Sequence, residues 1–167
     1  MNRKYLPVIL MGIFSLVLTS CITTTTFKES IMINAPAEII FAVITDYESY
    51  DELLPTLHDS IKIVSPEKTG MNVSWESTGT FKGHSFTTVW TVTEFTKNRS
   101  VKMEDLAEGI GETILKLNPI TEGNTIYTMY ISTKMFKPYE KEFIKIYREE
   151  MAIIKAESER LYKEQNL

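Results

Sequence analysis

Residues 33–38 read Ile33-Asn34-Ala35-Pro36-Ala37-Glu38, a junction at which a strand gives way to a helix. Proline suits the first turn of a helix, where its missing N–H costs no hydrogen bond, and a glutamate there meets the positive end of the helix dipole. Asn34 is a suitable N-cap for this helix. Before the junction, Phe27 to Asn34 alternates weakly between apolar and polar residues and predicts a first strand.

The chain after the junction predicts two consecutive helices. The first has a broad apolar face and should be largely buried, because it carries Ile39, Ile40, Phe41, Val43 and Ile44. The second begins at Asp46-Tyr47-Glu48-Ser49-Tyr50, in which Tyr47 and Tyr50 fall at helical spacing with Leu54. Pro55 ends this segment.

From Leu57 to Met135 the hydrophobic period changes to two, which predicts strands. The candidates are His58–Pro66, Met71–Phe81, His84–Thr96, Ser100–Leu106, Gly111–Leu117 and Thr125–Lys134. The breaks between them are short and polar, as Lys82-Gly83 shows, and consecutive strands joined by tight turns predict an antiparallel sheet. In the strand over 84–96 we expect Trp90 on the inner face and Phe95 on the outer face.

The C-terminal segment, Pro138 to about Lys163, predicts one long amphipathic helix. Its apolar stripe recurs at spacings of three, four and seven and consists of Tyr139, Phe143, Ile146, Tyr147, Ile154 and Leu161. Charged residues occupy the opposite face, several of them as pairs three or four residues apart.

This order of elements, together with the junction, resembles the SRPBCC superfamily. The matching residues are the 33–38 segment, Phe41, Val43, the 46–50 segment and Leu54-Pro55. The superfamily includes the START, birch-pollen allergen, polyketide cyclase/dehydratase and coenzyme Q-binding branches. The resemblance covers about Thr26 to Lys163 and implies an α+β helix-grip fold. In that fold a curved antiparallel sheet of about seven strands wraps around a long C-terminal helix, with two short helices after the first strand.

A helix-grip fold leaves a gap between sheet and helix, and concave apolar gaps are the usual form of small-molecule sites. The candidate ligand-binding residues are Trp75, Phe86, Trp90, Met103, Tyr130, Tyr139, Phe143 and Tyr147. The alternative is that these large side chains fill the gap as packed core, in which case no ligand site follows.

The N-terminus has the layout of a secretory signal peptide, with basic Arg3 and Lys4, an uncharged run from Leu6 to Leu18, and small residues before Cys21. Ending on the only cysteine of the chain, this layout resembles the bacterial lipobox. The resemblance implies a signal peptide over residues 1–20 and a Cys21 that carries acyl chains such as palmitate. A short Thr-rich tether over 21–26 would then lead to the domain over 27–167.

Three alternatives to the lipobox compete. A transmembrane anchor needs ~20 apolar residues, whereas Leu6 to Leu18 is short and contains Pro7 and Gly12. A plain cleaved signal with an incidental cysteine, or an uncleaved helix, would also leave Cys21 unmodified. The lipobox places the domain on the extracytoplasmic side of the cell envelope. The absence of an aspartate after Cys21 favours the outer membrane if the host has one.

The composition of the chain and the spacing of its ionisable residues limit the ligands and reactions that the sequence supports. Losing Arg3 and Lys4 with the signal takes the formal charge from −4 to −6, which gives no electrostatic case for nucleic acid. His58 and His84 lack a metal-ligand spacing, and we expect both at the surface or a sheet edge. Asp105 shares parity with inward residues, but we expect it as a solvated acid at a strand end. No catalytic constellation, metal site or cofactor is predicted.

The sequence therefore favours a membrane-anchored lipoprotein, expected as a monomer, that binds a small hydrophobic or amphipathic ligand. A lipid, a quinone and an aromatic metabolite all fit this description. One alternative is a cyclase/dehydratase-type enzyme that uses the same cavity, with Asp105 or His84 as its acid–base group. Another is an interaction lipoprotein whose interior holds no ligand.

Overall fold

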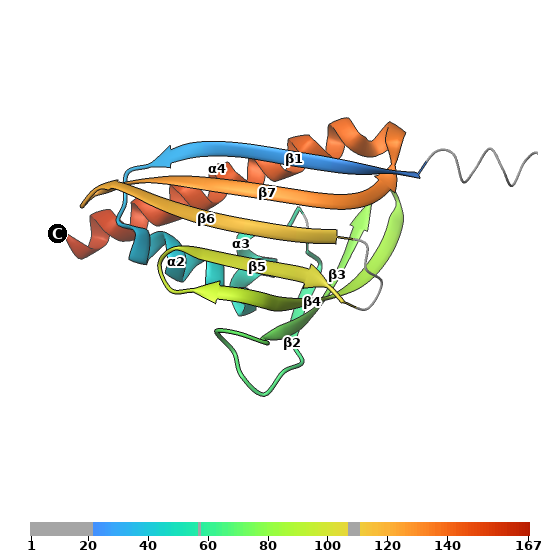
Figure 1. Ribbon diagram of the computed structural model, residues 1–167, viewed down its shortest axis with the longest axis horizontal. Helices are drawn as coiled ribbons and strands as arrows, with labels where there is room; N and C mark the ends of the chain where they lie inside the picture. Colours follow the sequence, from blue (N-terminus) through green and yellow to red (C-terminus); the bar gives the residue numbers. More distant parts are fainter. Residues whose placement is uncertain (1–21, 57, 107–110) are drawn as a thin grey trace, which may run out of the picture.

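The computed structural model describes residues 22–56, 58–106 and 111–167, and the signal segment with Cys21 lies outside them. Along the chain the elements are β1 (Ile22–Ile33), α2 (Ala37–Thr45), η1 (Tyr47–Ser49), α3 (Tyr50–Leu53), β2 (Ser60–Ile63), β3 (Ser74–Phe81), β4 (His84–Thr96), β5 (Ser100–Asp105), β6 (Gly111–Thr121), β7 (Asn124–Phe136), η2 (Lys137–Tyr139) and α4 (Glu140–Gln165). Figure 1 shows α4 crossing behind β1 and β7.

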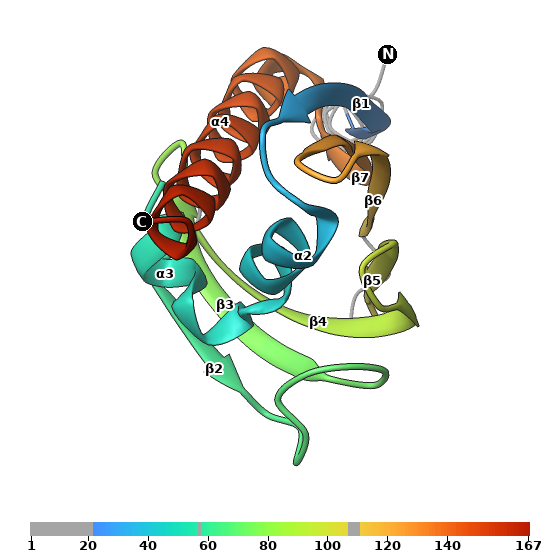
Figure 2. The same cartoon turned by 90° about the vertical axis from the view of Figure 1, so that its left-hand side faces the viewer.

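The described strands form one antiparallel sheet in the order β1-β7-β6-β5-β4-β3-β2, which confirms the predicted helix-grip fold. Figure 2 shows the sheet curling around α2 and α3, with α4 closing the open side. Short turns connect β3 to β4, β4 to β5 and β6 to β7, which are neighbours in the sheet. The turn between β3 and β4 uses Lys82 and Gly83 at φ 53° and 79°, the left-handed conformation that suits a two-residue hairpin loop.

β1 is longer than the sequence indicates. Residues 22–26, expected as a tether, form its first part and pair with the end of β7, from Ile22 opposite Phe136 to Thr26 opposite Ser132. The β-branched threonines favour extended backbone, and a partner strand is available to satisfy their peptide groups. The sheet therefore begins directly after Cys21 in the sequence.

A β-bulge in β4 reverses one expected orientation. The register with β5 shifts between Val92 and Glu94, so that Phe95 pairs with buried Val101. The extra residue moves Phe95 to the inner face, where its ring meets Phe41 edge-on at 5.2 Å. The expectation that Phe95 faces outward is thus wrong.

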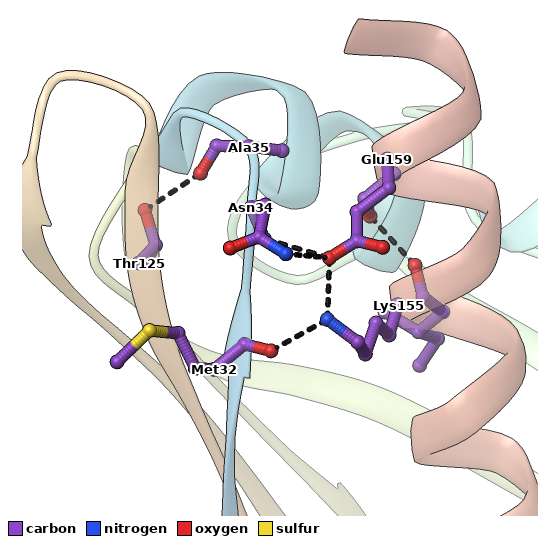
Figure 3. A network of polar contacts seen from close by, with 8 residues as sticks. Met32, Asn34, Ala35, Thr125, Lys155 and Glu159 are labelled. Carbon is purple, nitrogen blue, oxygen red and sulfur yellow. Dashed lines mark hydrogen bonds and ion pairs between the residues drawn. The ribbon is translucent and has the colours of Figure 1, made fainter. Parts of the chain in front are cut away.

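Asn34 does not cap α2; Pro36 occupies the N-cap, without a side-chain cap hydrogen bond. Instead, Asn34 donates its backbone N–H (2.8 Å) and its side-chain amide (2.9 Å) to Oε1 of Glu159 on α4. Lys155 pairs with the same carboxylate and donates to the carbonyl of Met32 at 2.8 Å (Figure 3). This network joins the end of β1 to the long helix.

The core lies between the inner face of the sheet and the helices. Its largest fully buried side chains include Trp75, Tyr47, Tyr127, Leu115, Met129 and Met151. Within the described residues, no helix combines the length and apolar character needed to cross a membrane.

Candidate ligand cavity

A small cavity lies between the inner face of the sheet and the last helix. Its lining residues come from α3, the segment before β2, strands β3 to β6, and α4. They are Tyr50, His58, Trp75, Trp90, Met103, Thr113, Leu115, Tyr147 and Glu150. The cavity volume is about 60 Å³, roughly the space that two water molecules occupy in the liquid. Most of the predicted gap is therefore filled by side chains.

Four of the eight sequence-predicted residues, Trp75, Trp90, Met103 and Tyr147, line this cavity together. Trp75 and Trp90 lie directly opposite each other on β3 and β4. Trp75 is almost fully buried and stacks on Tyr47 with ring centroids 4.2 Å apart. The inner parity of these strands was thus predicted correctly.

The other four predicted residues lie away from the cavity lining. Phe86 pairs with Gly79 further along β4, and Tyr139 packs against Phe81, His84 and Phe136. Phe143 meets the far side of Tyr147 edge-on at 4.6 Å. Tyr130 lies on the outer face of β7, because its neighbours Met129 and Ile131 are the buried residues of that strand. Whether any of the eight contacts a ligand stays a prediction.

The predicted ligand-binding residues did not include five members of the cavity lining: Tyr50, His58, Thr113, Leu115 and Glu150. Glu150 is the acidic one. It lies on α4 with only 8 % of its surface exposed. Among the described residues it has no hydrogen-bond or ion-pair partner, and burial raises the pKa of its carboxyl to about 8. A signal was present: Glu150 follows Ile146 by four residues and Tyr147 by three, so it occupies a position of the apolar stripe.

His58 is the second ionisable group at the cavity; it is half-buried and lies just before β2, the edge strand of the sheet. Its Nδ1 lies 2.7 Å from Oγ of fully buried Ser77, and its ring lies 6.0 Å from that of Tyr50. Burial lowers the pKa of the imidazole to about 4, against a smaller upward effect of Asp51. At neutral pH the cavity therefore holds a neutral imidazole and a protonated carboxyl.

Buried tyrosine hydroxyls add polar groups to this part of the core. The Tyr50 hydroxyl donates to the carbonyl of Ile44 at 2.6 Å, whereas the hydroxyls of Tyr47 and Tyr127 have no hydrogen-bond partner among the described residues. Burial, together with the nearby Glu150, raises the pKa of Tyr127 well above its ordinary value. Polar groups buried without partners are rare and costly, so their presence here marks a specialised region.

The other two acid–base candidates lie elsewhere. Asp105 is buried at the end of β5, opposite Trp90 on β4, and not solvated as expected. It lines a separate hollow of about 400 Å³ between the ends of β5, β6 and β7. His84 is exposed beside the β3–β4 turn, with its ring near Tyr139. Neither residue faces the cavity of Glu150.

Larger hollows lie at the surface. One of about 420 Å³ between α2, α3 and α4 has the acidic residues Asp46, Glu52 and Glu157 in its lining. No group of His, Cys, Asp or Glu in the described part of the chain is arranged to hold a metal ion. The inner cavity differs from these hollows in that its lining combines buried Glu150 with half-buried His58.

A curved antiparallel sheet closed by a long helix, with a cavity between them, defines a helix-grip domain of the START/SRPBCC type. The chain belongs to the family described as polyketide cyclase/dehydrase and lipid transport, whose model matches residues 24–159. Among curated proteins, none matches this chain.

Solved structures resemble the chain in fold. The Zhui aromatase/cyclase from Streptomyces sp. R1128 aligns with a TM-score of 0.65 at 10 % identity, over 87 % of this chain and 97 % of its own. A START superfamily protein from Mycobacterium smegmatis aligns with a TM-score of 0.63 at 13 % identity, over 84 % of this chain and 98 % of its own. Norcoclaurine synthase from Thalictrum flavum aligns with a TM-score of 0.61 at 13 % identity, over 89 % of this chain and 92 % of its own. At such identities the likeness establishes the architecture alone.

Proposed function

We propose that this protein is a membrane-anchored binding module whose small amphipathic ligand seats its polar end in the cavity beside Glu150. The observation that carries the proposal is the buried side chain of Glu150, which has no hydrogen-bond or ion-pair partner among the described residues, at an aromatic-lined cavity. Burying such a group costs free energy, and strongly perturbed ionisable groups in cavities concentrate at functional sites. The family, which includes lipid transport, supports the same class of function.

The cavity volume limits how a ligand binds. Pockets for drug-sized molecules measure ~300–1,000 Å³, several times the about 60 Å³ found here. We therefore propose that only the polar end of the ligand fits the existing space. The apolar body, whether of a lipid, a quinone or an aromatic metabolite, enters when flexible Met103 and half-buried Trp90 move.

We further propose that Cys21 anchors the domain to the membrane through acyl chains, on the extracytoplasmic side. The support is the sequence before Cys21 and the position of β1, which starts at the next residue. Two or more chains give stable anchoring at ~0.8 kcal/mol per buried CH₂. With no flexible tether between Cys21 and the sheet, the domain would lie directly against the membrane surface.

Ligand recovery tests the binding function. The protein is extracted in detergent from its own membrane, purified, and treated with organic solvent, and the released compounds are identified by mass spectrometry. We expect one compound in near-stoichiometric amount from the native chain. Thr113→Leu fills the cavity and should lose it, whereas Thr87→Leu makes the same change on an exposed position of β4 and should retain it. Equal recovery from both variants, or no compound from the native chain, would overturn the proposal.

A second candidate function, enzymatic catalysis, rests on the Glu150 carboxyl and the His58 imidazole. A carboxyl protonated near pH 7 and a neutral imidazole at one cavity are an acid and a base in the forms that proton-transfer chemistry uses. A cyclase/dehydratase-type reaction would then need Glu150 as its acid. Incubation of the recovered compound with the native protein tests this: a product of changed mass, formed at least ~100-fold more slowly by Glu150→Gln, supports an enzyme. An unchanged compound contradicts it.

A further inference from the structure

The charge inventory of the cavity indicates which ligands it accepts. Among its nine described lining residues, Glu150 is the acid, His58 is the one ionisable base, and there is no lysine or arginine. An anionic head group, such as a carboxylate or a phosphate, would find no cation and would face Glu150. Anions in proteins bind to Arg, Lys or clustered N–H donors, so the cavity is unsuited to them.

The remaining lining is aromatic. Tyr50, Trp75, Trp90 and Tyr147 contribute rings to the cavity. The faces of such rings attract cations, and tryptophan is the strongest of them. A carboxylate beside aromatic rings, in a space without competing cationic side chains, has the chemistry that holds an organic ammonium group.

We propose that the polar end of the ligand is an organic amine, bound as its ammonium ion in an ion pair with the Glu150 carboxylate against the rings of the cavity. This inference rests on the proposed binding function and specifies its ligand class. The volume of about 60 Å³ suits an ammonium group with a few carbons attached. The rest of the ligand would extend beyond the cavity.

Ammonium binding requires Glu150 to lose its proton. Among the described residues, Tyr147 on α4, Tyr50 on α3 and Tyr127 on β7 interact electrostatically with Glu150, and His58 lines the same cavity; these four are neutral near pH 7. Glu150 also lines a second small hollow together with exposed Glu149. Because burial raises the pKa of Glu150 to about 8, one proton leaves for each ammonium bound below that pH. The affinity should therefore rise about tenfold per pH unit from pH 6 to 7.5 and level off above 8.

The test uses three small probes of similar size: propylammonium, propan-1-ol and propanoate. Both tryptophans of the chain line the cavity, so intrinsic fluorescence reports binding there. The purified, ligand-stripped protein is titrated at constant ionic strength and millimolar probe concentrations, since such ligands gain at most ~1.5 kcal/mol per non-hydrogen atom. At pH 8.5 we expect propylammonium to bind at least tenfold more tightly than propan-1-ol, and propanoate not to bind.

Two variants and the pH profile separate the outcomes. Glu150→Gln should remove the preference for propylammonium while propan-1-ol still binds, and Glu149→Gln, on the exposed side of the same helix, should change neither. Propan-1-ol binding as tightly as propylammonium, tighter propanoate binding, or a flat pH profile would refute the amine and leave the binding function standing. Fluorescence unaffected by all three probes would overturn both proposals.

Discussion

Buried Glu150 and half-buried His58 have pKa values shifted in opposite directions. Burial keeps Glu150 protonated up to a pKa of about 8, and it keeps His58 neutral down to a pKa of about 4. The stability contributed by the protonated carboxyl is present at low pH and is lost as the pH rises from about 4.5 to about 8. The contribution of the neutral imidazole is present above pH 6.5 and is lost as the pH falls toward 4.

The first prediction follows from the opposite pH dependences of these two contributions to stability. Between pH 6.5 and 8 the titration of Glu150 dominates that of His58, so the free energy of unfolding should fall by roughly 1–1.5 kcal/mol across this window. Glu150→Gln mimics the protonated carboxyl and should remove this fall. Urea denaturation of both proteins at several pH values measures the difference. A native protein and a Glu150→Gln variant with parallel pH profiles would show that Glu150 is not held protonated by burial; Glu149→Gln serves as the control.

Glu150 and His58 show why the orientation of single side chains could not be predicted from the sequence. Glu150 occupies a stripe position, yet a charged residue there is normally assigned to solvent, since burial of a lone carboxyl is costly. His58 sits in a segment whose alternation is weak. For Tyr130, both faces of its strand carry large apolar residues, so the pattern did not determine which face turns inward.

At the scale of elements, strand order and helix positions follow from local signals. The hairpin turns and the period of two predicted β3 to β7, and the stripe predicted α4. What local signals could not give was the bulge near Thr93, because a bulge depends on the register with the neighbouring strand. The extension of β1 depends likewise on a long-range partner, β7, which alternation within residues 22–26 does not disclose.

The second prediction concerns the contact between β1 and α4. Glu159 accepts two hydrogen bonds from Asn34 and pairs with Lys155, which itself bonds the Met32 carbonyl (Figure 3). Glu159→Ala should lower the free energy of unfolding by about 1–2 kcal/mol. Glu157→Ala, which loses only a surface pair with Arg160, should cost less than about 0.5 kcal/mol. Chemical denaturation checks both, and equal losses would show that the network contributes no more than a surface ion pair.

For the molecule as a whole, the proposed lipid anchor at Cys21 determines where the domain is located. The third prediction is that Cys21→Ser abolishes acylation and moves the protein out of the membrane fraction. The reason is that serine has no thiol to carry the acyl chains that would hold the protein at the membrane. Intact mass and fractionation measure the outcome. A Cys21→Ser protein that keeps its acyl chains, or stays with the membrane, would contradict the lipid anchor.

The described interior of the molecule combines a packed core with a small, mostly aromatic-lined cavity that contains Glu150 and His58. The family resemblance predicted a gap between sheet and helix, and the structure shows that aromatic side chains occupy most of it. The sequence could not predict the residual volume, because packing depends on the rotamers of side chains from six elements and from the segment before β2. The binding function consequently depends on whether the cavity opens around a ligand.

The most direct test is an add-back titration. The compound recovered from the purified protein is returned to the stripped chain while the fluorescence of Trp75 and Trp90 is recorded. We expect a saturable change with one site per chain in the native protein and in Thr87→Leu, and its loss in Thr113→Leu. A linear, unsaturable response, or the same curve in Thr113→Leu as in the native protein, would contradict a ligand seat in this cavity.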